Sequence, residues 1–477
     1  MTGYLKWFME AMRPAFTREA TFSWFAVVFS GLVLRTDDLG VTSMVRALAL
    51  SPECYNSLLN FFRSSAWQVG GLTQRWWDWL MEQEVECRAN GRLVLLGDHT
   101  KTPKDGRRIP AVTTLHQDSE TASKPTFFRG HHWGCVALLV KSAHKCFAAP
   151  LEARIHEGLE LFEESGDEPS PKTITPKTIR MVQMARQVVE HIGETAYLVL
   201  DAYFAVGSVF NAAAEELNAI RNPVHILTRA KKNAVAYMRA PKKSKGKRGP
   251  QKQYGKKLKL MKLFDSRPHH FHTAEVTLYG NRDKVRYLVL NLLWKPVKGE
   301  IRFILVESSR GRIVLMTSDL EMDPLLALEL YSRRVTIEVL FDALKNTQGA
   351  MAYHFWSQSL SPASRRPRKN DDQPRDTTNI ENTRKTLGAI EKFVNLHLLV
   401  IGVLQLMAIK IPDQVKAKAR CWLRTVSSST PSEFVTRTAL ANLLKTNLSG
   451  LGEDPITQLI REKQKSYPNT WHYGDAA

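Results

Sequence analysis

The sequence is poor in cysteine and lacks any arrangement that would pair its cysteines. Only five cysteines occur among 477 residues, an odd number, and no two of them form a C-x-x-C pair. A disulfide framework is therefore excluded as the basis of the fold. Because this usage is typical of proteins from a reducing cytosol, we expect a cytoplasmic protein.

Long apolar runs are also lacking. Charged residues interrupt the first 20 positions, so neither a signal peptide nor a membrane span is predicted there. The most apolar run, residues 396–409, contains His397 and Gln405 and is shorter than the roughly 20 residues that a membrane span needs. We therefore expect a buried helix at this position and no membrane partner.

Glycine-rich phosphate-binding motifs are absent, and acidic residues are outnumbered. The sequence has neither a Walker-type loop nor a dinucleotide-binding glycine motif, which argues against nucleotide hydrolysis. Lys and Arg total 67 against 47 Asp and Glu, giving a net charge of +20. This excess favours a polyanionic partner, nucleic acid before a membrane surface, although a merely basic soluble protein has the same composition.

Residues 1–88 are predicted to be helical. Two apolar-periodic segments, 41–50 and 54–63, flank Ser51-Pro52-Glu53, in which the proline suits the start of a second helix. The pattern is typical of a helix-turn-helix that binds DNA. A helical hairpin with a purely structural role gives the same pattern.

Residues 89–230 mix short apolar strands with helices. The predicted order is strand, strand, strand, helix, strand, helix, strand, at residues 92–98, 133–141, 145–155, 178–192, 196–201, 207–220 and 224–228. This order indicates a mixed α/β fold. Asp98 and Asp201 each stand at the C-terminal end of a strand, where ligands gather in such sheets. Lys101 opens a basic stretch directly after Asp98.

Residues 231–323 interrupt this pattern as a predicted insertion. Residues 241–262 contain ten Lys or Arg and no acid, so we expect a flexible basic loop. Its lysines, among them Lys256, Lys257 and Lys259, either contact phosphates or are only solvated. Strand-like runs separated by glycine-containing turns then predict a β-meander at residues 272–279, 285–294, 300–307 and 312–317.

The segment 331–345 carries a tyrosine, an arginine, a glutamate and a lysine at offsets of 0, 3, 7 and 14, namely Tyr331, Arg334, Glu338 and Lys345. On a continuous helix these side chains share a stripe only about 60° wide. An apolar face borders the stripe and comprises Leu330, Ile337, Leu340, Phe341 and Leu344. The helix is therefore predicted to pack by one side and to present the other.

The residue types of this polar stripe are typical of a site that binds both a metal ion and phosphate groups. Glu338 would supply the hard oxygen ligand that Mg²⁺ or Mn²⁺ prefers, and Arg334 and Lys345 could neutralise backbone phosphates. A surface helix with ordinary salt bridges, Arg334 with Glu338 and Asp342 with Lys345, is the alternative. Together, Asp98, Asp201 and Glu338 are the carboxylates that a two-metal phosphoryl-transfer site would need from separate elements.

Two further regions carry weaker signals. Histidines and cysteines gather on predicted strands at His131, His132, Cys135, His144 and Cys146, but without zinc-knuckle spacing, so structural roles are favoured over a zinc site. Residues 357–477 are predicted to be a polar linker followed by helices. These helices either pack on the core or form a dimer.

The pattern Y-x2-R-x3-E-x6-K, matched by Tyr331, Arg334, Glu338 and Lys345, resembles the signature of the IS4-like bacterial DDE transposases, the group that includes the Tn5 and Tn10 enzymes, with the IS701-type branch as one candidate. Asp98 and Asp201 occur in the expected order. The β-rich insertion between Asp201 and Glu338 also resembles that group. The resemblance covers roughly residues 90–350.

The resemblance implies an α/β, RNase H-like catalytic core, residues 89–230 and 324–356, with a β-rich insertion at 231–323 and helical N- and C-terminal regions. It implies that Asp98, Asp201 and Glu338 form the DDE triad, with two Mg²⁺ or Mn²⁺ ions per active site. The implied reaction is DNA cleavage at terminal inverted repeats followed by strand transfer into target DNA, by a homodimer in a prokaryotic cytoplasm, associated with the nucleoid when DNA-bound.

The same resemblance implies that Tyr331, Arg334 and Lys345 hold the DNA backbone near the cleavage site. Trp294, at the end of a predicted strand, is the candidate for stacking a flipped base, although a core tryptophan has the same signature. Two other functions are compatible with the sequence. One is a catalytically silent, transposase-derived DNA-binding protein, and the other is an RNase H-like nuclease that cuts without joining.

Overall fold

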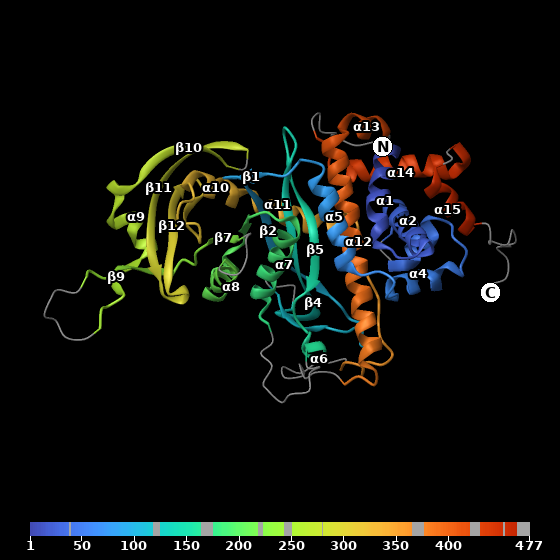
Figure 1. Ribbon diagram of the computed structural model, residues 1–477, viewed down its shortest axis with the longest axis horizontal. Helices are drawn as coiled ribbons and strands as arrows, with labels where there is room; N and C mark the ends of the chain where they lie inside the picture. The colour runs from blue at the N-terminus through green and yellow to red at the C-terminus, as the bar shows by residue number, and fades with distance from the viewer. Residues whose placement is uncertain are drawn as a thin grey trace.

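The computed structural model describes residues 1–37, 40–117, 125–163, 175–217, 223–242, 250–278, 280–364, 376–419, 430–451 and 454–464. Three parts follow one another along the longest axis of the molecule (Figure 1). A β-rich part with β9 to β12 stands at one end, a mixed sheet lies in the middle, and a layer of helices from both ends of the sequence stands at the other. The long helix α12 runs between the mixed sheet and the other helices.

The mixed sheet has the strand order β5–β4–β2–β6–β7. Its strands are β2 (Arg92–Pro103), β4 (Phe127–Lys141), β5 (Cys146–Ile155), β6 (Ala196–Val199) and β7 (Val224–Arg229). The first, β2, pairs parallel with β6 and antiparallel with β4. The predicted alternation of strands and helices is confirmed, with α7 (Lys177–Ile192) and α8 (Gly207–Leu217) in the two later connections. Residues 218–220 of the second predicted helix lie outside the described residues.

Smaller elements complete this part of the chain. They are β1 (Arg88–Ala89), β3 (Thr113–His116) and α6 (Glu160–Glu163). The strands form here because their residues are apolar on both faces, as expected for a sheet covered on two sides. Leu93 to Leu96 of β2 are all fully buried.

Successive side chains of β2 point to opposite faces of the sheet. A Cβ added at Gly97 would lie only 2.9 Å from the sulfur of Met181, so this glycine lets α7 approach the sheet closely. Asp98, the next residue, points to the other face. That face is covered by α11 (Val335–Asp342) and α12 (Ile380–Lys410), which both pack against β5.

The predicted insertion continues the same sheet. Its strands are β8 (Val235–Arg239), β9 (Tyr254–Lys259), β10 (His272–Leu278), β11 (Asn281–Trp294), β12 (Gly299–Ser308) and β13 (Gly311–Thr317), with a short helix α9 (Leu263–Ser266). The predicted meander of the last four strands is confirmed. Strand β13 pairs antiparallel with β7, so backbone hydrogen bonds connect the insertion to the mixed sheet.

The prediction of a flexible basic loop over residues 241–262 is wrong for its second half. Residues 254–259 form β9, which pairs with β8 at the edge of the sheet. The apolar Leu258 is buried between exposed lysines, and this alternation was masked in the sequence by the many charges around it. Residues 243–249 lie outside the described residues.

Helices from the two ends of the sequence pack into one layer. They are α1 (Thr2–Met12), α2 (Glu19–Leu34), α3 (Gly40–Ala47), α4 (Cys54–Arg63), α5 (Val69–Met81), α13 (Pro412–Lys418), α14 (Glu433–Thr446) and α15 (Pro455–Gln464), around α12. Phe62 of α4 contacts Phe393 of α12 with ring centroids 5.6 Å apart, and Arg437 of α14 donates to the carbonyl of Val33 at 3.1 Å. From the sequence we predicted two separate helical regions, residues 1–88 and 357–477, without a contact between them.

The helix α12 is long and apolar enough to cross a membrane by length and composition, but 94% of its most apolar window is buried within the protein. This agrees with the predicted buried helix at 396–409. Gly402 explains how α12 fits so deeply. A Cβ added at this position would lie 2.4 Å from the ring of Trp76, which is fully buried on α5.

Replacing Gly402 with alanine should therefore destabilise the protein by about 1–3 kcal/mol through overpacking. Gly388 is the matched control, because it lies on the same helix with nothing within 4 Å of an added Cβ. There alanine should stabilise the helix by up to about 1 kcal/mol. Thermal unfolding of both variants checks this, and equal Tm shifts of the same sign would contradict the close packing of α12 on α5.

Candidate active site

The segment 331–345 is not one continuous helix. Arg334 separates the first part, α10 (Pro324–Arg333), from the second, α11, and a π-helical turn, η6 (Ala343–Thr347), follows. The hydroxyl of Thr336 donates to the carbonyl of Arg333 at 2.8 Å, and the amide of Ile337 donates instead to the carbonyl of Arg334 at 3.1 Å. The side-chain hydroxyl thus competes with the regular helical bonds at this point.

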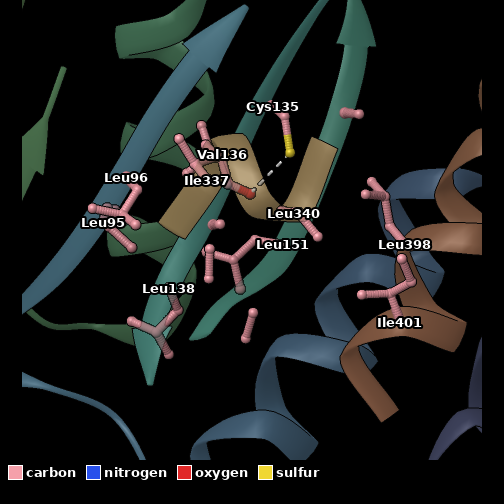
Figure 2. Close-up of a cluster of buried hydrophobic side chains, with 14 of the residues drawn as sticks. Leu95, Leu96, Cys135, Val136, Leu138, Leu151, Ile337, Leu340, Leu398 and Ile401 are labelled. Carbon is pink, nitrogen blue, oxygen red and sulfur yellow. Dashed lines mark hydrogen bonds between the residues drawn. The ribbon is translucent and has the colours of Figure 1, made fainter. Parts of the chain in front are cut away.

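The apolar face predicted for this segment is confirmed. Leu330, Ile337, Leu340, Phe341 and Leu344 are all buried. Figure 2 shows Ile337 and Leu340 of α11 against Leu96, Val136 and Leu151 of the sheet, with Leu398 of α12 beyond them. Because α11 is held by this side, Glu338 is carried on the opposite, exposed side.

Arg334 joins two of the three predicted acids. Its Nη1 lies 2.9 Å from Oδ2 of Asp98, and its Nη2 donates to Oε1 of Glu338. The guanidinium group is largely buried, with 17% of the side chain exposed. The predicted pair between Arg334 and Glu338 therefore exists, but it is one half of a bridge from α11 to β2 and not an isolated surface salt bridge.

Asp201 belongs to the same electrostatic cluster. It follows β6, one strand away from β2, and its Oδ1 accepts from the amide of Tyr203 at 3.0 Å. Burial, together with the charge of Asp201, raises the pKa of Asp98 to about 6, while Arg334 acts in the opposite direction. Burial also raises the pKa of Asp201, against the lowering effect of Arg334.

Three carboxylates around one guanidinium form a donor set of hard oxygen atoms, which is what Mg²⁺ or Mn²⁺ requires. Within the described parts of the chain, no three His, Cys, Asp or Glu side chains are grouped closely enough to hold a metal ion as they stand. Arg334 bridges Asp98 and Glu338, so that its positive charge lies between these two carboxylates. Divalent ions would therefore compete with this guanidinium for the same oxygen atoms.

The other residues of the predicted stripe lie close by. Nζ of Lys345 donates to the carbonyl of Lys101 at 3.3 Å, which links η6 to the strand that carries Asp98. Nζ of Lys101 donates in turn to the carbonyl of His116 at 2.8 Å. Burial opposes the charge of the Arg334 guanidinium, but Asp98 and Glu338, with a smaller contribution from the nearby Tyr331, raise its pKa. Asp342 accepts from the side chain of Asn346 at 2.6 Å.

Four predicted DNA contacts lie elsewhere. Trp294 is partly buried and packs edge-on against Phe210 of α8, with ring centroids 5.5 Å apart. Lys256, Lys257 and Lys259 are exposed on β9, at the opposite edge of the sheet from the mixed-sheet strands. They do not line the cluster of acids.

The sequence interpretation missed a histidine cluster on the α7 side of β2. Nε2 of His99 lies 3.0 Å from Nδ1 of His156, and the ring of His99 stacks on Phe204. Nδ1 of His132 lies 2.6 Å from Glu157, which is also bonded to Lys177. Burial lowers the pKa of His156 to about 3, so this ring is neutral at pH 7.

Strand register explains the missed cluster. His132 is the cross-strand partner of Lys101, which brings the two histidine-containing segments side by side. The adjacent His131 bonds instead to the hydroxyl of Tyr353 and the carbonyl of Pro110. The neighbouring histidines thus have separate partners, in agreement with the structural roles favoured over zinc. The alternation of side chains along β4 indicates that His131 and His132 face opposite sides of the sheet, but it does not predict the contact with His99 until β2 is known to be the neighbouring strand.

The raised pKa of Asp98 predicts how stability depends on pH. A carboxyl whose pKa rises from 3.8 in the unfolded chain to about 6 in the folded protein destabilises the folded state as it ionises. The wild type should therefore lose up to about 3 kcal/mol relative to Asp98→Asn between pH 4 and pH 7.5. Thermal unfolding in EDTA measures this. A Tm difference between the two proteins that does not change with pH would show that Asp98 is not a destabilised acid.

Comparison with known proteins agrees with this geometry. Residues 11–284, more than half of the chain, match the family of DDE superfamily endonucleases. The match includes Asp98 and Asp201 and ends before the helix that carries Glu338. No curated protein matches the chain. The mixed sheet carries Asp98 on β2 and Asp201 just after the neighbouring strand β6. This arrangement and the family match lead to one conclusion: the chain belongs to the DDE superfamily endonucleases, with an RNase H-like core.

Proposed function

We propose that this endonuclease is a transposase of the IS4-like group, of the IS701-type branch. It binds the terminal inverted repeats of its element, cleaves the DNA there, and joins the freed 3′ ends to target DNA. The observation that carries the proposal is the bridge of Arg334 between Asp98 and Glu338, beside Asp201, because it joins the Y-x2-R-x3-E-x6-K segment to the two aspartates of the neighbouring strands β2 and β6.

Asp98, Asp201 and Glu338 would hold two Mg²⁺ or Mn²⁺ ions. When bound, such ions activate the attacking oxygen and stabilise the leaving 3′-oxygen at phosphorus. Burial of Asp98 keeps water away from one side of the site, whereas the exposed Glu338 leaves the other side open to DNA. When DNA binds, Arg334 would leave Asp98 and Glu338 and pair with a DNA phosphate. Both carboxylates would then be available to the metal ions.

The remaining predicted residues would hold DNA around this site. Tyr331 lies on α10, Arg334 between α10 and α11, and Lys345 on η6, and the side chain of Lys345 bonds to the backbone of Lys101. The exposed lysines Lys256, Lys257 and Lys259 would contact the DNA backbone farther from the acids. Trp294 is proposed only as a base-stacking residue that would first have to leave Phe210.

The larger regions of the chain would have separate functions in DNA recognition, catalysis and assembly. In residues 1–88, the helix α4 exposes Tyr55, Asn56, Asn60 and Arg63, a polar face suited to the terminal repeats. Residues 89–230 and 324–356 would be the catalytic core and 231–323 the insertion that extends it. Residues 357–477 would support a homodimer on DNA. The protein would work in a prokaryotic cytoplasm, associated with the nucleoid when bound to DNA.

The test is a plasmid that carries the DNA flanking the gene, incubated with the protein and Mg²⁺. The variants Asp98→Asn, Asp201→Asn and Glu338→Gln should each lose cleavage by more than about a hundredfold. Binding of the same DNA should be largely unchanged. Asp342→Asn is the matched control, because this exposed acid lies on α11 but bonds only to Asn346 among the hydrogen bonds described, and it should cleave like the wild type.

Three outcomes would contradict the proposal in different ways. Cleavage at the wild-type rate by Glu338→Gln would remove this residue from the triad. Cleavage without joined products would identify a nuclease that does not transfer strands. Binding without cleavage by the wild type would identify a silent DNA-binding derivative.

A further inference from the structure

An open hollow of about 750 Å³ lies beyond the end of the strand that carries Asp98. It is lined by Arg107, Arg108, Ile109, His354, Trp356 and Gln358, with two further small residues. Two segments form it. One is the loop after β2, and the other follows η6 and therefore continues from the helix that carries Glu338. The hollow is thus connected through the chain both to β2, which carries Asp98, and to α11, which carries Glu338.

The second segment places its side chains in strict alternation. Tyr353, Phe355 and Ser357 are buried, whereas His354, Trp356 and Gln358 are exposed. The indole of Trp356 is 52% exposed, the most exposed tryptophan among the described residues with large exposed side chains. Since its neighbours fix the backbone, this ring is held at the surface and is not a poorly packed part of the core.

Both arginines are fixed by backbone carbonyls. Nε of Arg107 donates to the carbonyl of Ala363 at 2.8 Å, and Nη1 of Arg108 donates to the carbonyl of Gln358 at 2.5 Å. The amide of Ser357 donates to the carbonyl of Arg108 at 3.0 Å. No carboxylate pairs with Arg108 among the described side chains. Its guanidinium group is therefore positioned in advance and keeps its charge for an anion.

A buried lysine ties the hollow to the catalytic strand. Nζ of Lys104 donates to the carbonyls of Met351 and Tyr353, and it lies 3.7 Å from the centre of the Tyr353 ring. Along β2, Asp98 and Pro103 are five residues apart, which is roughly 17 Å at 3.3 Å per residue. The hollow is therefore a few nucleotide steps away from the acids.

The hollow also adjoins the proposed DNA-reading helix. Arg63 of α4 approaches the carbonyl of Trp356 at 3.5 Å. Tyr55 and Leu59 of α4 line a neighbouring cavity of about 180 Å³ together with His354. A strand of DNA that runs from α4 to the acids would therefore cross the hollow.

We propose that this hollow binds an unpaired nucleotide of the DNA, with its base stacked on Trp356 and its phosphate held by Arg108. An indole face recovers stacking only from a base whose own face is exposed, as in a single-stranded end or an opened base pair. The hollow falls within the range of volumes of small-molecule sites, which is enough for one nucleotide. The proposal rests on the proposed function, because it assigns part of the same DNA path.

Fluorescence anisotropy with two oligonucleotides tests the proposal. One is a blunt duplex, and the other is the same duplex with a short single-stranded extension that contains 2-aminopurine. Trp356→Ala should weaken binding of the extended duplex at least about fivefold, the lower end for loss of one base–aromatic stack. Binding of the blunt duplex should be unchanged. Quenching of the 2-aminopurine by the wild type should be lost in Trp356→Ala and retained in Trp356→Phe.

Arg108→Ala should reduce the slope of log affinity against log salt by about one. The matched controls are Phe434→Ala, an exposed aromatic on α14, and Arg75→Ala on α5, and neither should alter binding. Equal weakening of both duplexes by Trp356→Ala would show that the hollow contacts paired DNA. Unchanged binding of both would show that it contacts none. Either result overturns the proposal while the Mg²⁺-dependent cleavage of the wild type stands, whereas absence of that cleavage would instead overturn the proposed function.

Discussion

The ion pairs of Arg334 hold together groups that come from distant parts of the chain. Asp98 lies within the early strand β2 and Glu338 lies on the late helix α11, yet one guanidinium group binds both, and Asp201, just after the neighbouring strand β6, helps to raise the pKa of Asp98. A buried carboxylate is unfavourable unless it is paired. Arg334 thus makes the cluster of acids compatible with folding in the absence of metal. Under the proposed function, the same residue would have to leave the acids before they could bind divalent ions.

This bridge depends on how α11 is fixed. Ile337 and Leu340 of this helix pack on the sheet (Figure 2). The interruption at Arg334 is part of the arrangement, because it separates the end of α10 from the start of α11 at the residue that reaches toward Asp98. The helix α12 packs against β5 of the same sheet and connects helices from both ends of the chain (Figure 1).

Much of this could be predicted from the sequence, and the rest could not for identifiable reasons. Apolar runs before Asp98 and Asp201 predicted both strands, but the predicted strand end at Asp98 is wrong, because the polar residues after it still pair with β4 as far as Pro103. The apolar face of the Tyr331 segment was predicted correctly, but its break was not, because the bond from Thr336 to Arg333 is not visible in periodicity. Strand β9 was hidden by its charges, and the hollow around Trp356 depends on long-range contacts with the loop after β2.

Binding of Mn²⁺ to the DNA-free protein, measured by calorimetry at pH 8, tests the central claim most directly. At this pH the carboxyl of Asp98, with its pKa of about 6, is ionised in the wild type, so proton competition is small. If Arg334 is the cation that the metal must replace, Arg334→Gln should bind Mn²⁺ at least about tenfold more tightly than the wild type, since close charges interact by more than 1.4 kcal/mol. Equal or weaker binding by Arg334→Gln would contradict the account.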